Sequence, residues 1–320
     1  MTSGGEYLVA DIGATNARFR LADAHGWCSD PLLLSTGGFT ASEALLETAL
    51  HALGRPLLQQ ACLAVAGPVR NGRGRITNGT LEFHEDGAGR LLDCGVLVIN
   101  DFQAMARSLP ELEDLRQIGG VREPAADGGL KAVLGPGTGL GMGLLAGHSG
   151  GWQVLVSEGG HADLAPGNPL EAELLSVLQT SHGHVSWETV LSGPGLVRLY
   201  HAVCQLWGMP PDDLTAERIT ALGLHAAEPV CHQTLEIFFA LLGAAAGNVA
   251  LTAWAVGGVY LGGGIVPAMA EFAAHSPLRR RFEERGPLTG VVRDIPLYVI
   301  LDSDPGLAGA LGCLRDAVRR

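Results

Sequence analysis

One pattern occurs twice in the chain and constrains its fold more than any other feature: an apolar strand, a loop rich in glycine and threonine, and a second strand. The first copy spans residues 7–22, with its loop at residues 11–16. The second copy spans residues 131–156, with its loop at residues 135–141. The flanking residues are apolar or alternate between apolar and polar, as strands with one or two buried faces do. This repeat predicts a duplicated α/β fold that is rich in β-strands.

The chain length also favours two lobes. The chain has 320 residues, whereas one domain usually holds about 100 to 200 residues. Residues 110–129 change to an acidic sequence that contains proline and glycine, so we place the lobe boundary at the start of this segment. We therefore expect a small α/β lobe of residues 1–109 plus 303–320, and a large, helix-rich α/β lobe of residues 110–302.

Residue spacing predicts further elements in both lobes. In the first lobe we expect strands at residues 61–66 and 95–99, and a helix that Thr40 caps and that ends at Gly54. Residues 67–79 are expected to form turns and short edge strands. In the second lobe we expect strands at residues 259–261 and 297–301 and helices at residues 169–179, 186–191, 195–207, 215–224 and 234–256, with Thr215 as the cap of the fourth helix. In residues 303–320 we expect a helix at residues 305–318 that Ser303 caps.

The charge balance excludes several partners. The 21 basic and 33 acidic residues give a net charge of 21 − 33 = −12, so we expect no nucleic acid and no membrane surface as a partner. No uninterrupted apolar run reaches the roughly 20 residues that a membrane helix needs, and residues 237–251 are predicted to form a buried helix. Because no basic region precedes the first strand, we expect no signal peptide and a cytoplasmic protein.

The six cysteines are scattered along the sequence and include no C-x-x-C pair. This spacing indicates neither a zinc site nor a disulfide framework. We expect six reduced thiols, most of them in or near the core, because free cysteine is among the residues that are most often buried.

Residues 97–102, with the sequence Leu-Val-Ile-Asn-Asp-Phe, end an apolar strand at the point where a helix is expected to begin. Asn100 and Asp101 are therefore presented together at the end of a strand. The two glycine-rich loops lie on either side of this segment in the sequence. A carboxylate between two loops that suit phosphate predicts phosphoryl transfer.

The first loop reads Asp11-Ile12-Gly13-Ala14-Thr15-Asn16 and directly follows Ala10 in the first strand. Its glycine permits a tight turn, and Thr15, Asn16 and exposed amides can donate to phosphate oxygens. Asp11, which only accepts hydrogen bonds when ionised, suits Mg²⁺ or its water ligands. On its own, however, the D-x-G-x-T pattern is better explained as a hairpin turn with a capping aspartate.

The second loop carries a stronger signal, because four glycines and a threonine in seven residues exceed what a simple turn requires. We expect Gly137, Thr138 and Gly139 to contact phosphate. A third glycine run, Gly262-Gly263-Gly264, follows a predicted strand and precedes a predicted helix, so it suits either a flat ring or a phosphate at a helix N-terminus. The chain contains neither a dinucleotide fingerprint at this run nor a Walker pattern with Gly-Lys-Ser/Thr.

Two carboxylates and an imidazole suit a polyhydroxy substrate. Glu158 and His161 follow a hydrophobic strand, and Glu188 lies in the polar segment before residues 191–195. Side chains of these types grip adjacent sugar hydroxyls, because each hydroxyl both donates and accepts a hydrogen bond. Without its neighbours, His161 would be better explained as a structural histidine. We interpret His182 and His184 as surface or turn residues.

Taken together, these segments resemble the bacterial ATP-dependent glucokinase family, the zinc-free type, within the actin/hexokinase/Hsp70-like superfamily. The resemblance spans nearly the whole chain. Residues 11–18 are similar to the family's first phosphate loop, residues 99–102 to its catalytic segment, and residues 135–141 to its second phosphate loop. Further similar blocks, in the family's order, are residues 158–161, 191–196, 262–267 and 304–307.

The resemblance implies two actin-like (ribonuclease H-like) lobes with a cleft between them, ATP and Mg²⁺ as cofactors, glucose as the substrate, and a homodimer. It implies that Asp101 is the base that faces the 6-hydroxyl of glucose, and that the other hydroxyls are held by Asn100, Glu158, His161 and Glu188. The nucleotide is expected at residues 10–15, 137–139 and 262–264.

Two other functions stay open: a kinase for another hexose, an amino sugar or a carboxylate, because the superfamily shares its fold and nucleotide loops, and a non-catalytic sensor of sugar or nucleotide. The chain departs from the family at Ala14, where a glycine is usual. The added methyl group restricts the backbone of that turn to conformations that a non-glycine residue tolerates. We expect the turn to accommodate it.

Overall fold

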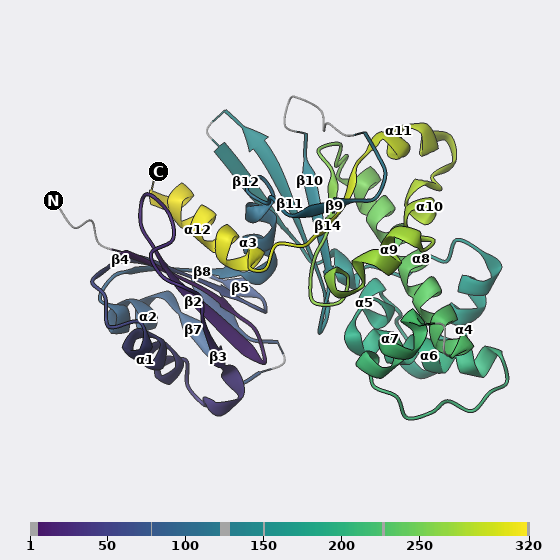
Figure 1. Cartoon of the computed structure of the whole chain (residues 1–320), viewed down its shortest axis with the longest axis horizontal. Helices are drawn as coiled ribbons and strands as arrows, with labels where there is room; N and C mark the ends of the chain where they lie inside the picture. The colour runs from purple at the N-terminus through teal and green to yellow at the C-terminus, as the bar shows by residue number, and fades with distance from the viewer. Residues whose placement is uncertain (1–5, 78, 122–128, 150, 226–227, 319–320) are drawn as a thin grey trace. The chain divides into compact units, whose positions relative to one another are not determined.

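The computed structural model describes residues 6–77, 79–121, 129–149, 151–225 and 228–318. Contacts divide the chain into two units (Figure 1). The first unit holds residues 1–113, 148–155 and 302–320, and the second holds residues 114–147 and 156–301. The lobe bounds that we expect from the sequence stay a prediction. Part of the expected boundary segment, residues 122–128, lies outside the described residues.

The first unit is built on a five-stranded sheet with the order β3-β2-β1-β4-β8. Its strands are β1 (Glu6–Ile12), β2 (Asn16–Ala22), β3 (Leu32–Ser35), β4 (Leu58–Val65) and β8 (Gly95–Asn100). The strands β1 and β2 form the predicted antiparallel hairpin. The strands β1, β4 and β8 run parallel, and Ile12, Val65 and Asn100 lie in one row across them. The carboxyl ends of these three strands therefore share one edge of the sheet.

Helices cover both faces of this sheet, with α1 (Ser42–Ala52) and α2 (Glu85–Leu92) on one face and α3 (Asp101–Ser108) and α12 (Pro305–Val318) on the other (Figure 1). Successive residues of a strand point to opposite faces. Leu8 accordingly packs in the cluster that contains the α1 and α2 side chains, and Val9 packs with α3 and α12. A small sheet and one 3₁₀ turn complete this unit: β5 (Val69–Arg70), β6 (Arg73–Arg75), β7 (Glu82–His84) and η1 (Thr36–Gly38).

The second unit repeats the strand arrangement of the first. Its sheet has the order β12-β11-β10-β13-β14-β9; residues 148–155, which hold most of the edge strand β12, are counted with the first unit by their contacts. The strands are β9 (Leu115–Gln117), β10 (Lys131–Pro136), β11 (Leu140–His148), β12 (Gly151–Ser157), β13 (Val259–Leu261) and β14 (Leu297–Ile300). As in the first unit, an antiparallel hairpin (β10 and β11) is followed by two parallel strands (β13 and β14). This repetition confirms the predicted duplicated α/β fold.

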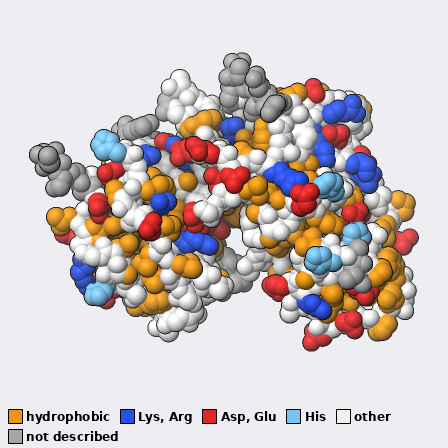
Figure 2. All heavy atoms as spheres, viewed as in Figure 1, with side chains coloured by type: hydrophobic (Ala, Val, Ile, Leu, Met, Phe, Trp, Pro, Cys, Tyr) orange, Lys and Arg blue, Asp and Glu red, His pale blue; other side chains and the backbone are white. Residues whose placement is uncertain are grey.

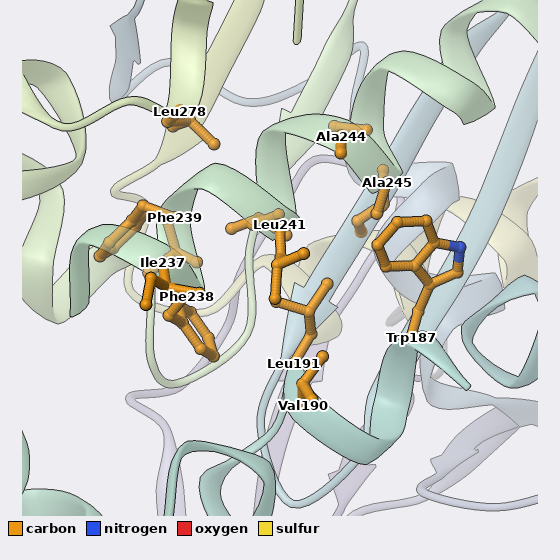
Figure 3. Packing of buried hydrophobic residues seen from close by; sticks show 14 of the residues in the cluster. Trp187, Val190, Leu191, Ile237, Phe238, Phe239, Leu241, Ala244, Ala245 and Leu278 are labelled. Carbon is orange, nitrogen blue, oxygen red and sulfur yellow. The ribbon is translucent and has the colours of Figure 1, made fainter. Parts of the chain in front are cut away.

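Helices form most of the remainder of the second unit. They are α4 (Pro169–His182), α5 (Trp187–Val190), α6 (Gly193–Leu206), α7 (Ala216–Leu224), α8 (Pro229–Thr252), α9 (Ala270–His275), α10 (Leu278–Glu283) and α11 (Thr289–Asp294), with the 3₁₀ turns η2 (Gly159–His161), η3 (Pro267–Met269) and η4 (Gly286–Leu288). The longest, α8, packs against α6, α7 and α10. Figure 3 shows its side chains Phe238, Phe239 and Leu241 within this core.

The helix α8 contains the buried helix expected at residues 237–251. By length and composition it is apolar enough to cross a membrane, but 72% of its most apolar window is buried inside the protein. Its glycines allow the close packing that the sequence predicts. A Cβ atom at Gly243 would collide with the carbonyl oxygen of Leu278, and one at Gly247 with that of Phe282, so these glycines let α10 lie directly against α8.

Several expected helix starts are wrong. The helix α1 begins at Ser42 after Ala41, whose side chain makes no capping bond, so Thr40 is not its cap. The residue directly before α12 is Asp304, to which Ser303 donates a hydrogen bond of 2.9 Å, so Ser303 is not at the cap position. Thr215 does cap α7, because its side chain accepts a hydrogen bond from the backbone of the third helical residue.

Two further differences concern proline. The helix α8 begins at Pro229, five residues earlier than expected, because proline suits the first helical position. No α-helix directly follows the third glycine run. A 3₁₀ turn begins at Pro267 and α9 begins only at Ala270, so the expectation of a helix N-terminus at these glycines is wrong.

The cysteines lie mostly where the sequence predicts. Cys62, Cys204 and Cys231 are buried, Cys94 and Cys313 are half-buried, and only Cys28 is exposed among the described cysteines. Figure 2 shows that the Arg side chains over α10 and α11 are mixed with acidic side chains. Two pairs of oppositely charged side chains on α10 and beside it form hydrogen-bonded ion pairs, Arg279 with Glu283 and Arg280 with Glu284. The basic charges on this surface are therefore largely balanced locally.

Candidate active site

The strand β8 ends in Asn100, and this side chain fixes the start of α3. Its Oδ1 atom accepts hydrogen bonds from the backbone amides of Phe102 (2.9 Å) and Gln103 (3.2 Å), so Asn100 is the N-cap of the helix. Its Nδ2 atom donates to the carbonyl oxygen of Gly67 (3.0 Å) and to Oδ1 of Asp101 (2.9 Å). Asn100 therefore holds the Asp101 carboxylate in one orientation at the edge of the sheet.

The environment of Asp101 favours its neutral form. The pKa of this carboxyl is raised to about 7, first by burial and then by the negative charge of Asp11. The backbone amides of Phe102 and Asp101 and the side chain of Asn100 oppose this rise by donating hydrogen bonds to the ionised form. A carboxylate whose pKa lies near neutral pH suits a general base.

Asp11 lies near the end of β1, in the same row as Ala64 of β4 and Ile99 of β8. Burial raises the pKa of Asp11, the positive charge of Arg18 lowers it, and the charge of Asp304 raises it. Arg18 is the cross-strand partner of Asp11 in the hairpin, and its Nε atom lies 3.4 Å from Oδ1 of Asp304. The first unit thus places three carboxylates and one guanidinium at the edge where its parallel strands end.

Within the described part of the chain, no three His, Cys, Asp or Glu side chains are close enough together to hold a metal by themselves. Mg²⁺ in a nucleotide complex is usually held by one or two carboxylates together with phosphate oxygens and water, so it does not need such a cluster. Asp11 is half-buried at the sheet edge and is the carboxylate that fits this function.

The first loop is a closed turn. The amide of Gly13 donates to the carbonyl oxygen of Asn16 (2.9 Å), and Thr36 donates through Oγ1 to the carbonyl of Ala14 (2.6 Å) and through its amide to that of Thr15 (2.9 Å). Ala14 is not among the residues with a left-handed backbone. The turn therefore accommodates its methyl group, as expected.

The neighbours of this turn differ in what they expose. Ala10 and Ile12 have wholly buried side chains, so only their backbone is available to a ligand. The side chains of Thr15 and Asn16 are exposed beside the turn. Arg18 and Asp304 have no individual function in the sequence interpretation. The hairpin register was the available signal for Arg18, since it places this residue opposite Asp11.

In the second unit, the glycine-rich segments meet at the second loop. The amide of Gly137 donates to the carbonyl of Gly139, and the carbonyl of Gly137 accepts from the amide of Gly193 (both 2.8 Å). Gly263 has a left-handed backbone with φ of 78°, and a Cβ atom there would collide with the carbonyl oxygen of Pro136. The third glycine run therefore lies directly against the second loop, whose tip at Thr138 is exposed.

The short helix α5 positions Glu188 beside the same loop. Figure 3 shows its side chains Trp187 and Val190, with Leu191 after it, packed toward residues of α8. This anchor fixes α5, and the half-buried Glu188 accepts a hydrogen bond of 2.7 Å from the backbone amide of Leu140 through Oε2. A Cβ atom at Gly139 would collide with that oxygen. The glycine at this position therefore makes room for a carboxylate.

The segment with Glu158 and His161 is brought to Glu188 by short backbone contacts. The amide of Trp187 donates to the carbonyl of Ala162 (3.0 Å), and Nδ1 of His161 lies 3.9 Å from Oε1 of Glu188. His161 and Glu158 are exposed. Three side chains predicted to hold sugar hydroxyls thus lie on segments that contact one another within the second unit.

One contact near this group was not expected. Nε2 of His184 lies 2.6 Å from Oδ1 of Asp163, beside the isolated bridge between Asp163 and Ser186. His184 is exposed, as predicted, but it joins the two segments that carry His161 and Glu188. The sequence offered no signal for this pair, because 20 residues separate its members in the chain.

Two repeated sheets, each with a hairpin whose loop contains glycine, and a carboxylate at the end of a parallel strand are features of the sugar kinases with the actin-like ATPase fold. Comparisons with known proteins identify the family. The family model for glucokinase matches residues 8–317. The chain therefore belongs to the glucokinase family, and it is a hexose kinase that phosphorylates glucose with ATP.

Relatives support this assignment. A glucokinase from Chromobacterium violaceum is 42% identical over 312 residues, which cover 97% of this chain and 89% of that protein. The crystal structure of a glucokinase from an Antarctic psychrotroph has a TM-score of 0.86 and 35% identity, and the match covers 98% of this chain and 100% of that one. A glucokinase from Streptomyces griseus in complex with glucose and AMPPNP shares the fold, with a TM-score of 0.62, 19% identity and coverage of 96% and 98%.

Proposed function

We propose that this chain transfers the γ-phosphoryl group of MgATP to the 6-hydroxyl of glucose and that Asp101 is the base. The observation that carries this proposal is the fixed Asp101 carboxylate at the end of β8, held by Asn100 and charge-coupled to Asp11. The Streptomyces griseus structure, which has the same fold, contains both glucose and AMPPNP. These are the two types of substrate that the proposed reaction needs.

Transition states of phosphoryl transfer are loose, so positioning and charge neutralisation matter more than the strength of the base. Asp101 accepts the proton of the 6-hydroxyl as the new bond to phosphorus forms. Asn100 prevents the carboxylate from rotating, because both hydrogens on its Nδ2 atom are donated within the protein. A water molecule would compete with the sugar as acceptor, so we expect sugar binding to bring the lobes together and exclude water.

The nucleotide is proposed to lie against the first loop, the second loop and the third glycine run. In the second unit, the exposed Thr138 at the tip of the second loop and the exposed Gly264 offer hydrogen-bond donors without a bulky side chain. When bound, Mg²⁺ neutralises phosphate charge. Asp11 would hold it directly or through water.

The sugar is proposed to contact Glu158, His161 and Glu188 in the second unit. These side chains include two carboxylates and an imidazole, which together accept from and donate to hydroxyl groups. Asn100 in the first unit already uses its Oδ1 atom and both Nδ2 hydrogens within the protein, so it is proposed to act on the sugar by holding Asp101. A kinase for another hexose or an amino sugar would use the same types of side chain. The degree of selectivity among sugars is therefore a separate question from the reaction.

The test is a coupled assay of ADP release with MgATP and a panel of glucose, mannose, glucosamine and N-acetylmannosamine. We expect glucose to give the highest kcat/KM. The variant Asp101→Asn is expected to lose about a thousandfold in kcat, which lies within the contribution that a general base typically makes. Turnover near the wild-type value in a folded Asp101→Asn variant would show that Asp101 is not the base.

We also propose a cytoplasmic homodimer. Free thiols are typical of reducing compartments, and the structure has six free cysteines among the residues it describes. The dimer is expected from the family resemblance alone. Light scattering during size-exclusion chromatography tests it, since one chain has a mass of 33.3 kDa.

A further inference from the structure

We propose that Glu188 is a positioning residue for the second loop, so that a sugar held by Glu188 strengthens nucleotide binding at that loop. This inference rests on the proposed function, which gives sugar hydroxyls to Glu188 and phosphate groups to the loop. The inference adds that binding of the sugar and binding of the nucleotide are coupled through a residue of the second unit. The link is a single carboxylate whose two oxygens face different groups.

The contacts of the carboxylate show this division. Oε2 of Glu188 accepts the hydrogen bond from the amide of Leu140, the residue that closes the second loop and begins β11 (2.7 Å). Oε1 lies 3.9 Å from Nδ1 of His161, on the side of the predicted sugar ligands. A sugar hydroxyl that donates to Oε1 therefore restricts the rotation of the same group that holds Leu140.

The second loop is shaped to receive this contact. Gly139 lacks the Cβ atom that would collide with Oε2 of Glu188. On the other side of the loop, the amide of Gly193 holds the carbonyl of Gly137, and Ser192 donates to the carbonyl oxygen of Glu188 (3.0 Å). The segment of residues 188–193 thus forms hydrogen bonds to the second loop on both sides of Thr138, and Thr138 itself stays exposed.

The backbone of α5 is held in place by buried side chains, so it does not move readily when a ligand binds to Glu188. Trp187, Val190 and Leu191 are buried in the core of the second unit (Figure 3). Because this backbone is anchored, a ligand on Glu188 acts mainly on the side chain and on the amide that the side chain holds. Ordering of the second loop by the first substrate lowers the entropy cost of binding the second, which is positive coupling.

The test measures the dissociation constant of Mg-AMPPNP by calorimetry, with and without saturating glucose. The ratio of the two constants is the coupling factor. In the wild-type chain we expect a factor well above one. Glu188→Gln weakens the hydrogen bond to Leu140, and Gly139→Ala displaces the same carboxylate without changing its chemistry. Each variant is expected to weaken nucleotide binding without sugar about tenfold, as loss of one charge-assisted hydrogen bond does, and to bring the coupling factor close to one.

The matched control is His161→Asn, which changes the sugar side and leaves the bond to Leu140 intact. It is expected to weaken glucose binding and to leave nucleotide binding without sugar at the wild-type value. The double variant Glu188→Gln with Gly139→Ala should be no worse than either single variant, because both break one interaction. Additive losses would show two independent effects and would overturn the inference.

The outcomes separate this inference from the proposed function. If the wild-type chain binds glucose and Mg-AMPPNP and turns over, but Glu188→Gln and Gly139→Ala keep the wild-type coupling factor, Glu188 is a sugar ligand only and the inference fails alone. Tighter nucleotide binding in Glu188→Gln would also overturn it, since the carboxylate would then repel phosphate. A wild-type chain that binds neither ligand would overturn both.

Discussion

Replacing Asp101 by asparagine should abolish activity and stabilise the protein. The pKa of Asp101 is about 7, against 3.8 without the influence of the fold. The native state therefore binds a proton more tightly than the unfolded state, and stability falls as pH rises through this interval. With 1.36 kcal/mol per pKa unit, the raised pKa lowers the stability, relative to a side chain that never ionises, by about 2 kcal/mol at pH 5 and by about 4 kcal/mol at pH 8; these are upper limits, since the carboxyl group is partly exposed.

Asparagine keeps the size of the side chain and one acceptor for the hydrogen bond from Asn100, but it has no charge to bury. Urea unfolding at pH 5 and pH 8 measures the difference, and hydrogen exchange of peptides from β4 and α3 assigns it to the first unit. We expect the stability gain of Asp101→Asn to be larger at pH 8 than at pH 5. The control Asp30→Asn makes the same change in net charge at an exposed position and should gain little at either pH.

Two results would refute this reasoning. An equal gain at both pH values would show that Asp101 does not titrate between them. A loss of stability at pH 8 would show that the ionised carboxylate is stabilised by its hydrogen bonds more than it is penalised by burial and by the charge of Asp11.

The same raised pKa predicts that kcat/KM falls about tenfold per pH unit below about 7, and a pH profile that stays flat down to pH 5 would contradict a base at this position. The variant Gly309→Ala should destabilise the first unit by about 1 to 3 kcal/mol, because a Cβ atom would collide with a backbone carbonyl of α3; Gly290→Ala, where the space is open, is the control in urea unfolding. Arg281→Met should cost about 3 to 5 kcal/mol because it leaves the buried Glu171 without its partner. Adding Glu171→Gln should recover most of that loss in the same assay.

The strands and most helices were predictable because their sequences are locally consistent. The segment Val259–Leu261 is apolar between turn residues and forms β13 with those bounds. Two elements whose sequences favour no single secondary structure, α2 and β3, were not predicted. The helix α2 contains two glycines within eight residues, and its hydrophobic content is low. The strand β3 is only four residues long and lies at the edge of its sheet.

For the site, contiguous motifs were predictable and distant pairs were not. Asn100 and Asp101 are adjacent in the sequence, so the end of one strand presents both. The contact between Arg18 and Asp304 joins the first hairpin to the start of α12, and no local pattern specifies such a pair. Whether the predicted residues bind sugar and nucleotide stays a prediction.

The glycines of the second unit show how a correct motif can have more than one physical cause. Their density suggested phosphate contact, yet Gly139 makes room for Glu188, and Gly263 makes room for the carbonyl of Pro136. Gly160, next to His161, likewise lies against the carbonyl of Leu140. Because each of these glycines lacks a Cβ atom, a different segment can pack closely against the second loop at each of them. The segment proposed for sugar and the segment proposed for nucleotide are thus both packed on residues 135–141. The proposed coupling between the two substrates therefore requires a change in only one side chain, that of Glu188.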